Sequence, residues 1–245
     1  MEQHIYHRMR EIEDAHWWFA GRRAIVRQAL MSLNLPRAAN ILDVGCGTGG
    51  NLGLLAQFGN AHGVELDDGA AALARERGIG QIKKGALPDA IPFAGKSFDL
   101  AVMLDVLEHI DDDEASLAAL GRLLKPRGYL LITVPAFMFL WGPHDVEHHH
   151  KRRYVARRLR ACLEGAGFEV EHLSYYNSLL FPAVAAVRVL ERFLPSRSSA
   201  ADLRMPGKVT NKLLRGILSS ERHIVSRMRI PFGISLIAIA RKKCS

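Results

Sequence analysis

The chain contains 245 residues, 49% of them hydrophobic, and its formal net charge at pH 7 is +8. This composition excludes an intrinsically disordered chain, and no run approaches the roughly 20 apolar residues that a membrane-spanning helix needs. The first residues lack the basic and apolar stretches of a secretory signal, and three widely separated cysteines indicate neither a disulfide framework nor a Cys-x-x-Cys metal site. A cytoplasmic protein is therefore expected.

Short apolar segments alternate with helical patterns from residue 40 onward. The helical patterns cover residues 50–58, 68–78, 112–124 and 155–166. The apolar or alternating segments, which predict strands, cover residues 40–44, 61–66, 81–83, 97–104, 129–134, 168–174 and 234–240. This alternation predicts an α/β fold in which helices cover both faces of a parallel sheet.

Two regions lie outside the alternating pattern. Residues 1–34 are expected to form an N-terminal helical cap in front of the main domain, which takes residues 35–245. Residues 177–231 are expected to be a helical insertion before the last strand, because this stretch is longer than a hairpin connection needs. Its helices are predicted over residues 179–194 and 209–228.

A glycine-rich turn follows the first predicted strand. Gly45, Gly47 and Gly49 allow positive φ and leave no Cβ to block a ligand that lies on the backbone. The turn opens onto the N-terminus of the next predicted helix, which favours an anionic group. Glu65 ends the second predicted strand, where a carboxylate can bind both hydroxyls of a ribose.

The turn by itself fits two classes of cofactor. Gly45, Gly47 and Gly50 also satisfy the spacing of nicotinamide dinucleotide enzymes. However, Asp43 precedes the first glycine by two residues, where it would repel a phosphate but hold an ammonium group. The acidic segment 105–109 likewise suits a sulfonium better than a diphosphate, so both features favour S-adenosylmethionine.

Several segments together carry a resemblance to a known family. Residues 41–49 (ILDVGCGTG), 64–67 (VELD) and 105–110 (DVLEHI) resemble class I S-adenosylmethionine-dependent methyltransferases of the methyltransferase type 11 or ubiquinone-biosynthesis kind. The resemblance implies a Rossmann-like, seven-stranded, mostly parallel sheet with an antiparallel last strand. The cofactor-binding residues that it implies are Asp43, Gly45, Cys46, Gly47, Gly49, Glu65, Leu66, Ala86, Leu87 and Asp105. Ala86 departs from the pattern, because many relatives carry an acid there for the adenine amino group.

Acidic and histidine residues follow the fourth predicted strand. His109 is predicted to act as a general base with a pKa near neutrality. Two alternatives remain open at this segment. Asp105, Glu108 and His109 would hold a divalent ion, as the similar segment does in some quinone O-methyltransferases, or Glu108 and His109 merely cap the next helix. The favoured expectation is that this segment binds no metal ion.

A second histidine group follows the fifth predicted strand. His144 and His150 are predicted to be catalytic residues beside the substrate, with Asp145 as their orienting partner. Zinc is not expected in this group, because the run has no cysteine partner and consecutive histidines point in different directions.

Substrate contacts are predicted for Trp18, Arg22, Arg152 and Tyr154. The tryptophan precedes the first strand, where it either folds over the cofactor or packs the N-terminal helix onto the core. Guanidinium groups bind phosphate or carboxylate in a bidentate manner. The alternative is that Arg152 pairs with acids of the N-terminal segment.

The predicted function is transfer of a methyl group from S-adenosylmethionine to a small-molecule acceptor. Residues 173–187 contain no Asp, Glu, Lys or Arg, and arginines follow them. Such a segment could contact an anionic membrane surface, close over an apolar substrate or bury itself in a homodimer, and a monomer is equally compatible. A lipid-linked, isoprenoid or aromatic acceptor is therefore favoured, and the cytoplasmic protein would then be membrane-associated.

Three other functions stay open. Residues 151–160 hold six Lys or Arg and no acid, which would suit a nucleic-acid substrate. Against this, the fourth strand ends in Leu104-Asp105-Val106-Leu107 and not in the Asn/Asp-Pro-Pro-aromatic segment of base-amino methyltransferases, so no nucleic-acid partner is favoured. The remaining alternatives are a nicotinamide-dependent oxidoreductase and a non-catalytic protein that binds S-adenosylmethionine.

Overall fold

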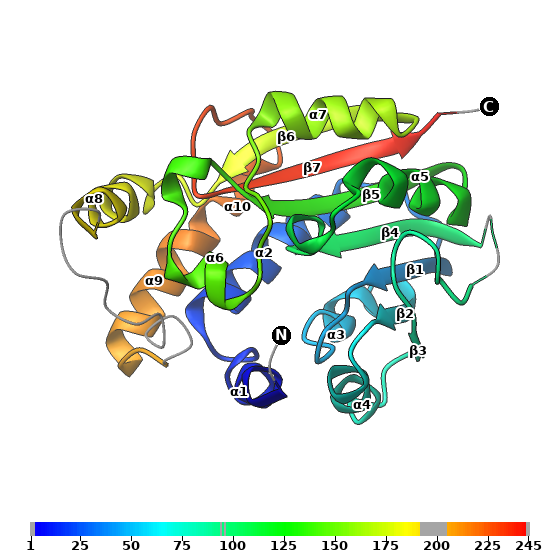
Figure 1. The fold of residues 1–245 in the computed structure, drawn as a ribbon, viewed down its shortest axis with the longest axis horizontal. Coiled ribbons are helices and arrows are strands. Elements are labelled where there is room, and N and C mark those ends of the chain that lie inside the picture. The colour runs from blue at the N-terminus through cyan, green and yellow to red at the C-terminus, as the bar shows by residue number, and fades with distance from the viewer. Residues whose placement is uncertain (1–2, 94, 96, 192–204, 244–245) are drawn as a thin grey trace.

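The computed structural model of the protein describes residues 3–93, 95, 97–191 and 205–243. Within these ranges the strands form one seven-stranded sheet in the order β3-β2-β1-β4-β5-β7-β6, seen across Figure 1. The strands are β1 (Ala39–Val44), β2 (Gly59–Glu65), β3 (Gln81–Lys84), β4 (Phe98–Leu104), β5 (Leu124–Pro135), β6 (Phe168–Tyr176) and β7 (Ser235–Lys242). Only β7 pairs in the antiparallel sense, with β5 on one side and β6 on the other. The predicted fold class is confirmed.

Helices cover both faces of the sheet, as the alternation of apolar segments predicts. They are α1 (Gln3–Ile12), α2 (Trp17–Met31), α3 (Leu52–Leu55), α4 (Asp68–Arg75), α5 (Asp113–Leu123), α6 (Pro143–Glu147), α7 (Ala156–Gly165), α8 (Phe181–Glu191), α9 (Lys208–Ser220) and α10 (Arg222–Val225). Two short 3₁₀ turns, η1 (Leu107–His109) and η2 (Met138–Leu140), follow β4 and β5.

The two faces of β4 show how the core is divided. Ala101 and Met103 belong to one apolar cluster together with residues of α5 and α7. Leu100 and Val102 point to the opposite face and belong to a second cluster with residues of α2, α3 and α4. Because successive strand residues alternate between faces, a strand buried on both sides is apolar throughout. The carboxyl ends of these buried strands form the edge at which the site lies.

Two predicted helices differ from those observed. The helix expected over residues 50–58 is reduced to α3, because residues 49–51 form a turn and β2 already begins at Gly59. The helix expected over residues 209–228 is interrupted at Glu221, which separates α9 from α10. Its buried carboxylate accepts a hydrogen bond of 2.9 Å from the backbone N–H of Leu179, so it ties both helices to the segment before α8.

The helical insertion lies between β6 and β7, as predicted. Helix α8 covers the described part of the helix expected over residues 179–194, and residues 192–194 lie outside the described ranges. None of the residues of α8 is buried, and in Figure 1 the helix lies at the periphery of the molecule. Across the described ranges, every helix is too short or too polar to cross a membrane.

Candidate active site

The glycine turn after β1 adopts the backbone that the sequence predicts. Gly45 and Gly47 have φ values of +68° and +55°. A Cβ on Gly45 would approach the side chain of Val106 to 2.7 Å, whereas a Cβ on Gly47 would meet no atom within 4 Å. The space beside Gly47 is therefore open to a ligand that lies directly on the backbone.

The carboxylate of Glu65 joins this turn to the end of β2. One of its oxygens accepts a hydrogen bond of 2.8 Å from the backbone N–H of Gly47, and the other accepts one of 3.0 Å from Asp67. Each carboxylate oxygen has a second lone pair, so the anchored group can still accept bonds from a pair of ligand hydroxyls.

Two of the predicted cofactor residues do not line the cavity at this turn. The side chain of Asp43 lies behind the turn and is only 1% exposed, and burial raises its pKa to about 7 although Arg22 opposes this effect. Gly49 has a φ of +79° and faces Arg77 and Leu52, within 2.9 Å of its ideal Cβ position. Their direct contact with the cofactor stays a prediction, since neither residue belongs to the cavity wall.

Helix α1 closes over the turn, which the sequence does not indicate. The hydroxyl of Thr48 donates a 2.6 Å hydrogen bond to the buried carboxylate of Glu13, which also pairs with Arg77. A Cβ on Gly50 would lie 2.1 Å from the same carboxylate, so a larger residue at this position would displace the Glu13 side chain. Tyr6 and Met9 of α1 thereby become part of the cavity wall.

A buried ion pair links α2 to the end of β4. The guanidinium of Arg22 donates to Asp105, and the hydroxyl of Thr133 donates a 3.0 Å hydrogen bond to the other oxygen of this carboxylate. Beside this pair, Trp18 stacks on Tyr176 with an interplanar angle of 18°. Arg22, Trp18 and Asp105 all line the cavity, so the sequence identified residues that the fold brings together.

The segment after β5 holds a buried charged network. Asp145 accepts hydrogen bonds of 2.8 and 2.9 Å from Arg153, and its Oδ1 lies 2.8 Å from Nδ1 of His150. Burial alone would raise the pKa of Asp145, but the bonds from His150 and Arg153 outweigh it and hold this pKa well below its usual range. Asp145 therefore lies where the sequence predicts an orienting partner for His150. The role of Arg153 was not predicted.

Burial makes the neighbouring histidines weak bases. It lowers the pKa of His109 and of His144 to about 4, with a further contribution from His150 in each case. The ring of His109 lies 4.7 Å from that of His150, between ring centroids. The expectation that the pKa of His109 stays near neutrality is therefore wrong, because that expectation assumed an exposed side chain.

Arg152 and Tyr154, for which the sequence predicts substrate contacts, lie away from the cavity. Tyr154 is completely buried and donates a 2.8 Å hydrogen bond to Asp113, and Arg152 pairs with the same carboxylate at 3.0 Å. Neither side chain lines the cavity. Both anchor α5 to the segment before α7, and their acidic partner is in α5 and not in the N-terminal segment.

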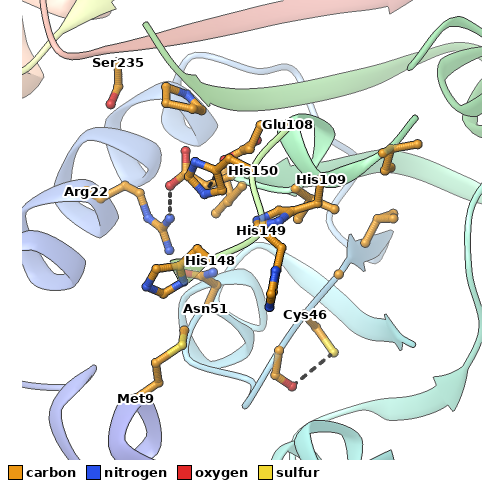
Figure 2. A pocket seen from close by; sticks show the side chains of 18 of the residues that line it. Met9, Arg22, Cys46, Asn51, Glu108, His109, His148, His149, His150 and Ser235 are labelled. Atoms are coloured by element: carbon orange, nitrogen blue, oxygen red, sulfur yellow. Dashed lines mark hydrogen bonds and ion pairs between the residues drawn. The ribbon is translucent and has the colours of Figure 1, made fainter. Parts of the chain in front are cut away.

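All these elements surround one cavity of about 1090 Å³, part of which is shown in Figure 2. The predicted residues Cys46, Leu66, Ala86 and Leu87 line it. Its wall also contains residues for which the sequence predicted no site role: Tyr6, Met9, Glu13, Asn51, Val184 and Arg188. Four of them belong to α1 and α8, which are distant from the glycine turn along the chain. The cavity thus runs from the glycine turn to the histidines and the edge of α8.

Fold and site together define a nucleotide-cofactor enzyme of the seven-stranded methyltransferase type, and comparison with known proteins agrees. The model of the methyltransferase domain family matches residues 17–173, which is more than half of the chain. The chain therefore belongs to this family, the class I S-adenosylmethionine-dependent methyltransferases. Helix α1 and the insertion lie outside the matched range, although both contribute to the cavity.

Named relatives share about a third of their aligned residues with this chain. Demethylmenaquinone methyltransferase of Tropheryma whipplei is 30% identical over 62% of this chain and 56% of its own length. Ubiquinone biosynthesis O-methyltransferase of Xanthomonas axonopodis is 31% identical over 61% of this chain and 71% of its own length. The chain spans about three fifths of the length of the first curated relatives that it matches.

Solved structures support the fold. A Haloferax volcanii protein in complex with the Trm112 methyltransferase activator aligns over 98% of this chain and 95% of its own, with a TM-score of 0.64 at 19% identity. Phosphoethanolamine N-methyltransferase 2 of Haemonchus contortus, in complex with S-adenosyl-L-methionine, aligns over 86% of this chain and 50% of its own, with a TM-score of 0.56 at 18% identity.

Open space at Gly47 and the anchored carboxylate of Glu65 fit S-adenosylmethionine, the cofactor of this family.

Proposed function

We propose that the protein transfers the methyl group of S-adenosylmethionine to a small-molecule acceptor with a large apolar part. The observation that carries this proposal is the single cavity of about 1090 Å³ that joins the glycine turn to the histidines. Pockets for one small molecule ordinarily measure about 300–1,000 Å³. The cavity therefore has room for the cofactor and an acceptor side by side.

The cofactor would occupy the end of the cavity at the glycine turn. Gly45 and Gly47 offer backbone without side chains, and Glu65 offers acceptors for the ribose hydroxyls. Ala86 and Leu87 would contact the adenine mainly through backbone groups. S-adenosylmethionine supplies a methyl group that is already activated on a sulfonium, so the protein has chiefly to align the reactants and exclude water.

The acceptor would occupy the other end. Trp17, Trp18 and Phe19 of α2 line this cavity together with Leu140 and Val184, which gives it an apolar and aromatic wall. Such a wall binds an apolar body, while the histidines face the polar group that receives the methyl. The names of the demethylmenaquinone and ubiquinone-biosynthesis relatives support an isoprenoid or aromatic acceptor.

Helix α8 supports peripheral contact with a membrane that holds such an acceptor. Val187 and Leu190 are 51% and 58% exposed, and Val184 of the same helix lines the cavity. An exposed apolar helix at the cavity would lie at the lipid interface, and the net charge of +8 favours anionic lipids.

The test is calorimetry with S-adenosylmethionine, S-adenosylhomocysteine and NAD, followed by a labelled-methyl screen against lipid and metabolite extracts. We expect both adenosyl compounds to bind and NAD not to bind, and we expect label in an apolar small molecule. Gly47→Val should block binding, whereas Gly165→Val, at an exposed helix end with open space around it, should not.

Each other outcome selects another function. Binding of NAD alone would contradict the proposal in favour of an oxidoreductase. Cofactor binding without transfer would indicate a non-catalytic binding protein, and label in nucleic acid would overturn the small-molecule acceptor.

A further inference from the structure

Three side chains with metal-ligating atoms converge at one side of the cavity. Glu108 and His109 belong to η1 after β4, and His150 follows α6 some 40 residues later in the chain. One ligand atom from each lies within 4.8 Å of the others. Figure 2 shows the three side chains grouped together, and all three line the cavity.

The carboxylate of Glu108 has no partner that explains its position. Its side chain is completely buried, and neither oxygen has a hydrogen-bond partner among the described residues. The nitrogen Nε2 of His150 lies 4.0 Å from Oε1, which is too far for a hydrogen bond. Buried carboxyl groups are normally protonated, hydrogen-bonded, paired or bound to a metal, so this position can accept a cation.

The ring of His150 is held with one nitrogen available. Its Nδ1 lies 2.8 Å from Asp145, which Arg153 keeps ionised through two hydrogen bonds. A carboxylate at this distance favours the tautomer in which Nδ1–H donates, so the lone pair of Nε2 faces Glu108. Metal-ligating histidines almost always donate their other ring N–H to a carboxylate, a carbonyl or a water in this way.

Asp105 is not part of the same cluster. Its two oxygens are already held by Arg22 and by Thr133. The set of Asp105, Glu108 and His109 that the sequence offered as an alternative is therefore replaced at one position, because the fold brings in His150 from a distant segment.

We propose that Glu108, His109 and His150 bind one divalent first-row transition-metal ion, such as Zn²⁺ or Co²⁺. Two imidazoles and one carboxylate form a donor set that favours such ions, whereas Mg²⁺ and Ca²⁺ prefer oxygen ligands alone. Two donors on one ion are at most about 4.2 Å apart, so small side-chain rotations would draw the cluster together. The side of the ion that faces the cavity would remain open to water or to an acceptor oxygen.

The test is a titration of the chelator-treated full chain with Co²⁺ and then Zn²⁺, followed by calorimetry and by visible absorption. Neither cofactor nor acceptor is added, so the outcome is independent of the methyl-transfer proposal. We expect one Co²⁺ per chain with visible d–d bands, which Zn²⁺ displaces and a large excess of Mg²⁺ does not.

Glu108→Gln and His150→Gln should each weaken Co²⁺ binding at least 10-fold. The matched control is His149→Ala, since this exposed residue of the same histidine run is outside the cluster and should bind Co²⁺ like the natural chain. Circular dichroism checks folding, and His109→Gln replaces any variant that does not fold. The proposal is overturned if the natural chain takes up no Co²⁺, or if the folded Glu108→Gln and His150→Gln variants bind it as tightly as the natural chain.

Discussion

The backbone N–H of Gly47 donates a 2.8 Å hydrogen bond to the carboxylate of Glu65, so the glycine turn and the end of β2 form one rigid unit. The second oxygen of this carboxylate is held by the backbone of Asp67 at 3.0 Å. A charged group with both oxygens anchored loses little freedom when it binds a ligand, which favours tight and specific binding of a ribose.

Glu65→Gln should weaken S-adenosylmethionine binding about 10- to 100-fold. The amide nitrogen of glutamine cannot accept a hydrogen bond, so one anchor and one ribose acceptor are lost, and bonds to a charged group contribute about 1.5–3 kcal/mol each. Calorimetry measures the change. Glu76→Gln, at an exposed position at the end of α4, is the control and should bind normally. Equal affinity in both variants would contradict the assigned role of Glu65.

The local part of this arrangement could be predicted from the sequence. Glycines at 45 and 47, the carboxylate at 65 and the acids after β4 each follow a buried strand, and parallel strands end at a common edge. The apolar runs also predicted the faces of the sheet, because a strand buried on both sides shows no polar alternation.

Contacts between distant segments could not be predicted in the same way. Glu13 and Thr48 are 35 positions apart, and Asp113 meets Tyr154 across 41. Nothing in a local pattern states which acid an arginine or a tyrosine will contact, so Tyr154 was predicted at the substrate although it is completely buried. The same limit concealed the convergence of Glu108 with His150.

Arg22→Met should destabilise the fold by about 3 kcal/mol, because it leaves the carboxylate of Asp105 without its charged partner. The side chains of this pair are 9% and 22% exposed. In urea unfolding, the double variant Arg22→Met/Asp105→Asn should lose less free energy of unfolding than the sum of the losses in the two single variants. Arg160→Met, which breaks the more exposed pair with Glu164, should cost about 0.5 kcal/mol. Strict additivity would show that Arg22 and Asp105 are not coupled.

Tyr154→Phe should reduce stability by about 1 kcal/mol and leave methyl transfer unchanged. The variant removes the hydrogen bond to Asp113 but keeps the ring in the core, and Arg152 still satisfies the carboxylate. Urea unfolding and the KM for the acceptor measure the two effects. Trp18→Phe is the contrasting variant and should raise the KM for the acceptor, because Trp18 lines the cavity. A raised KM with unchanged stability in Tyr154→Phe would instead place Tyr154 at the substrate site.

Asp43→Asn should make the protein more stable at high pH. Burial raises the pKa of Asp43 from 3.8 to about 7, so the folded chain binds a proton that the unfolded chain has lost between these values. The free energy of unfolding of the natural chain must therefore fall as pH rises from about 4 to 7, by about 1.4 kcal/mol for each pH unit.

Asparagine carries no charge, so the Asp43→Asn variant should lack this decline. At pH 8 its free energy of unfolding should exceed that of the natural chain by on the order of 4 kcal/mol. Urea unfolding at pH 5, 6, 7 and 8 measures the two curves, with Asp68→Asn at an exposed position as the control for loss of one carboxylate. Because this difference arises from the proton on Asp43, it should be roughly 1.5 kcal/mol at pH 5 and should grow steadily up to pH 7. A difference that is the same at every pH would show that Asp43 is ionised throughout, and that the positive charge of Arg22 outweighs burial.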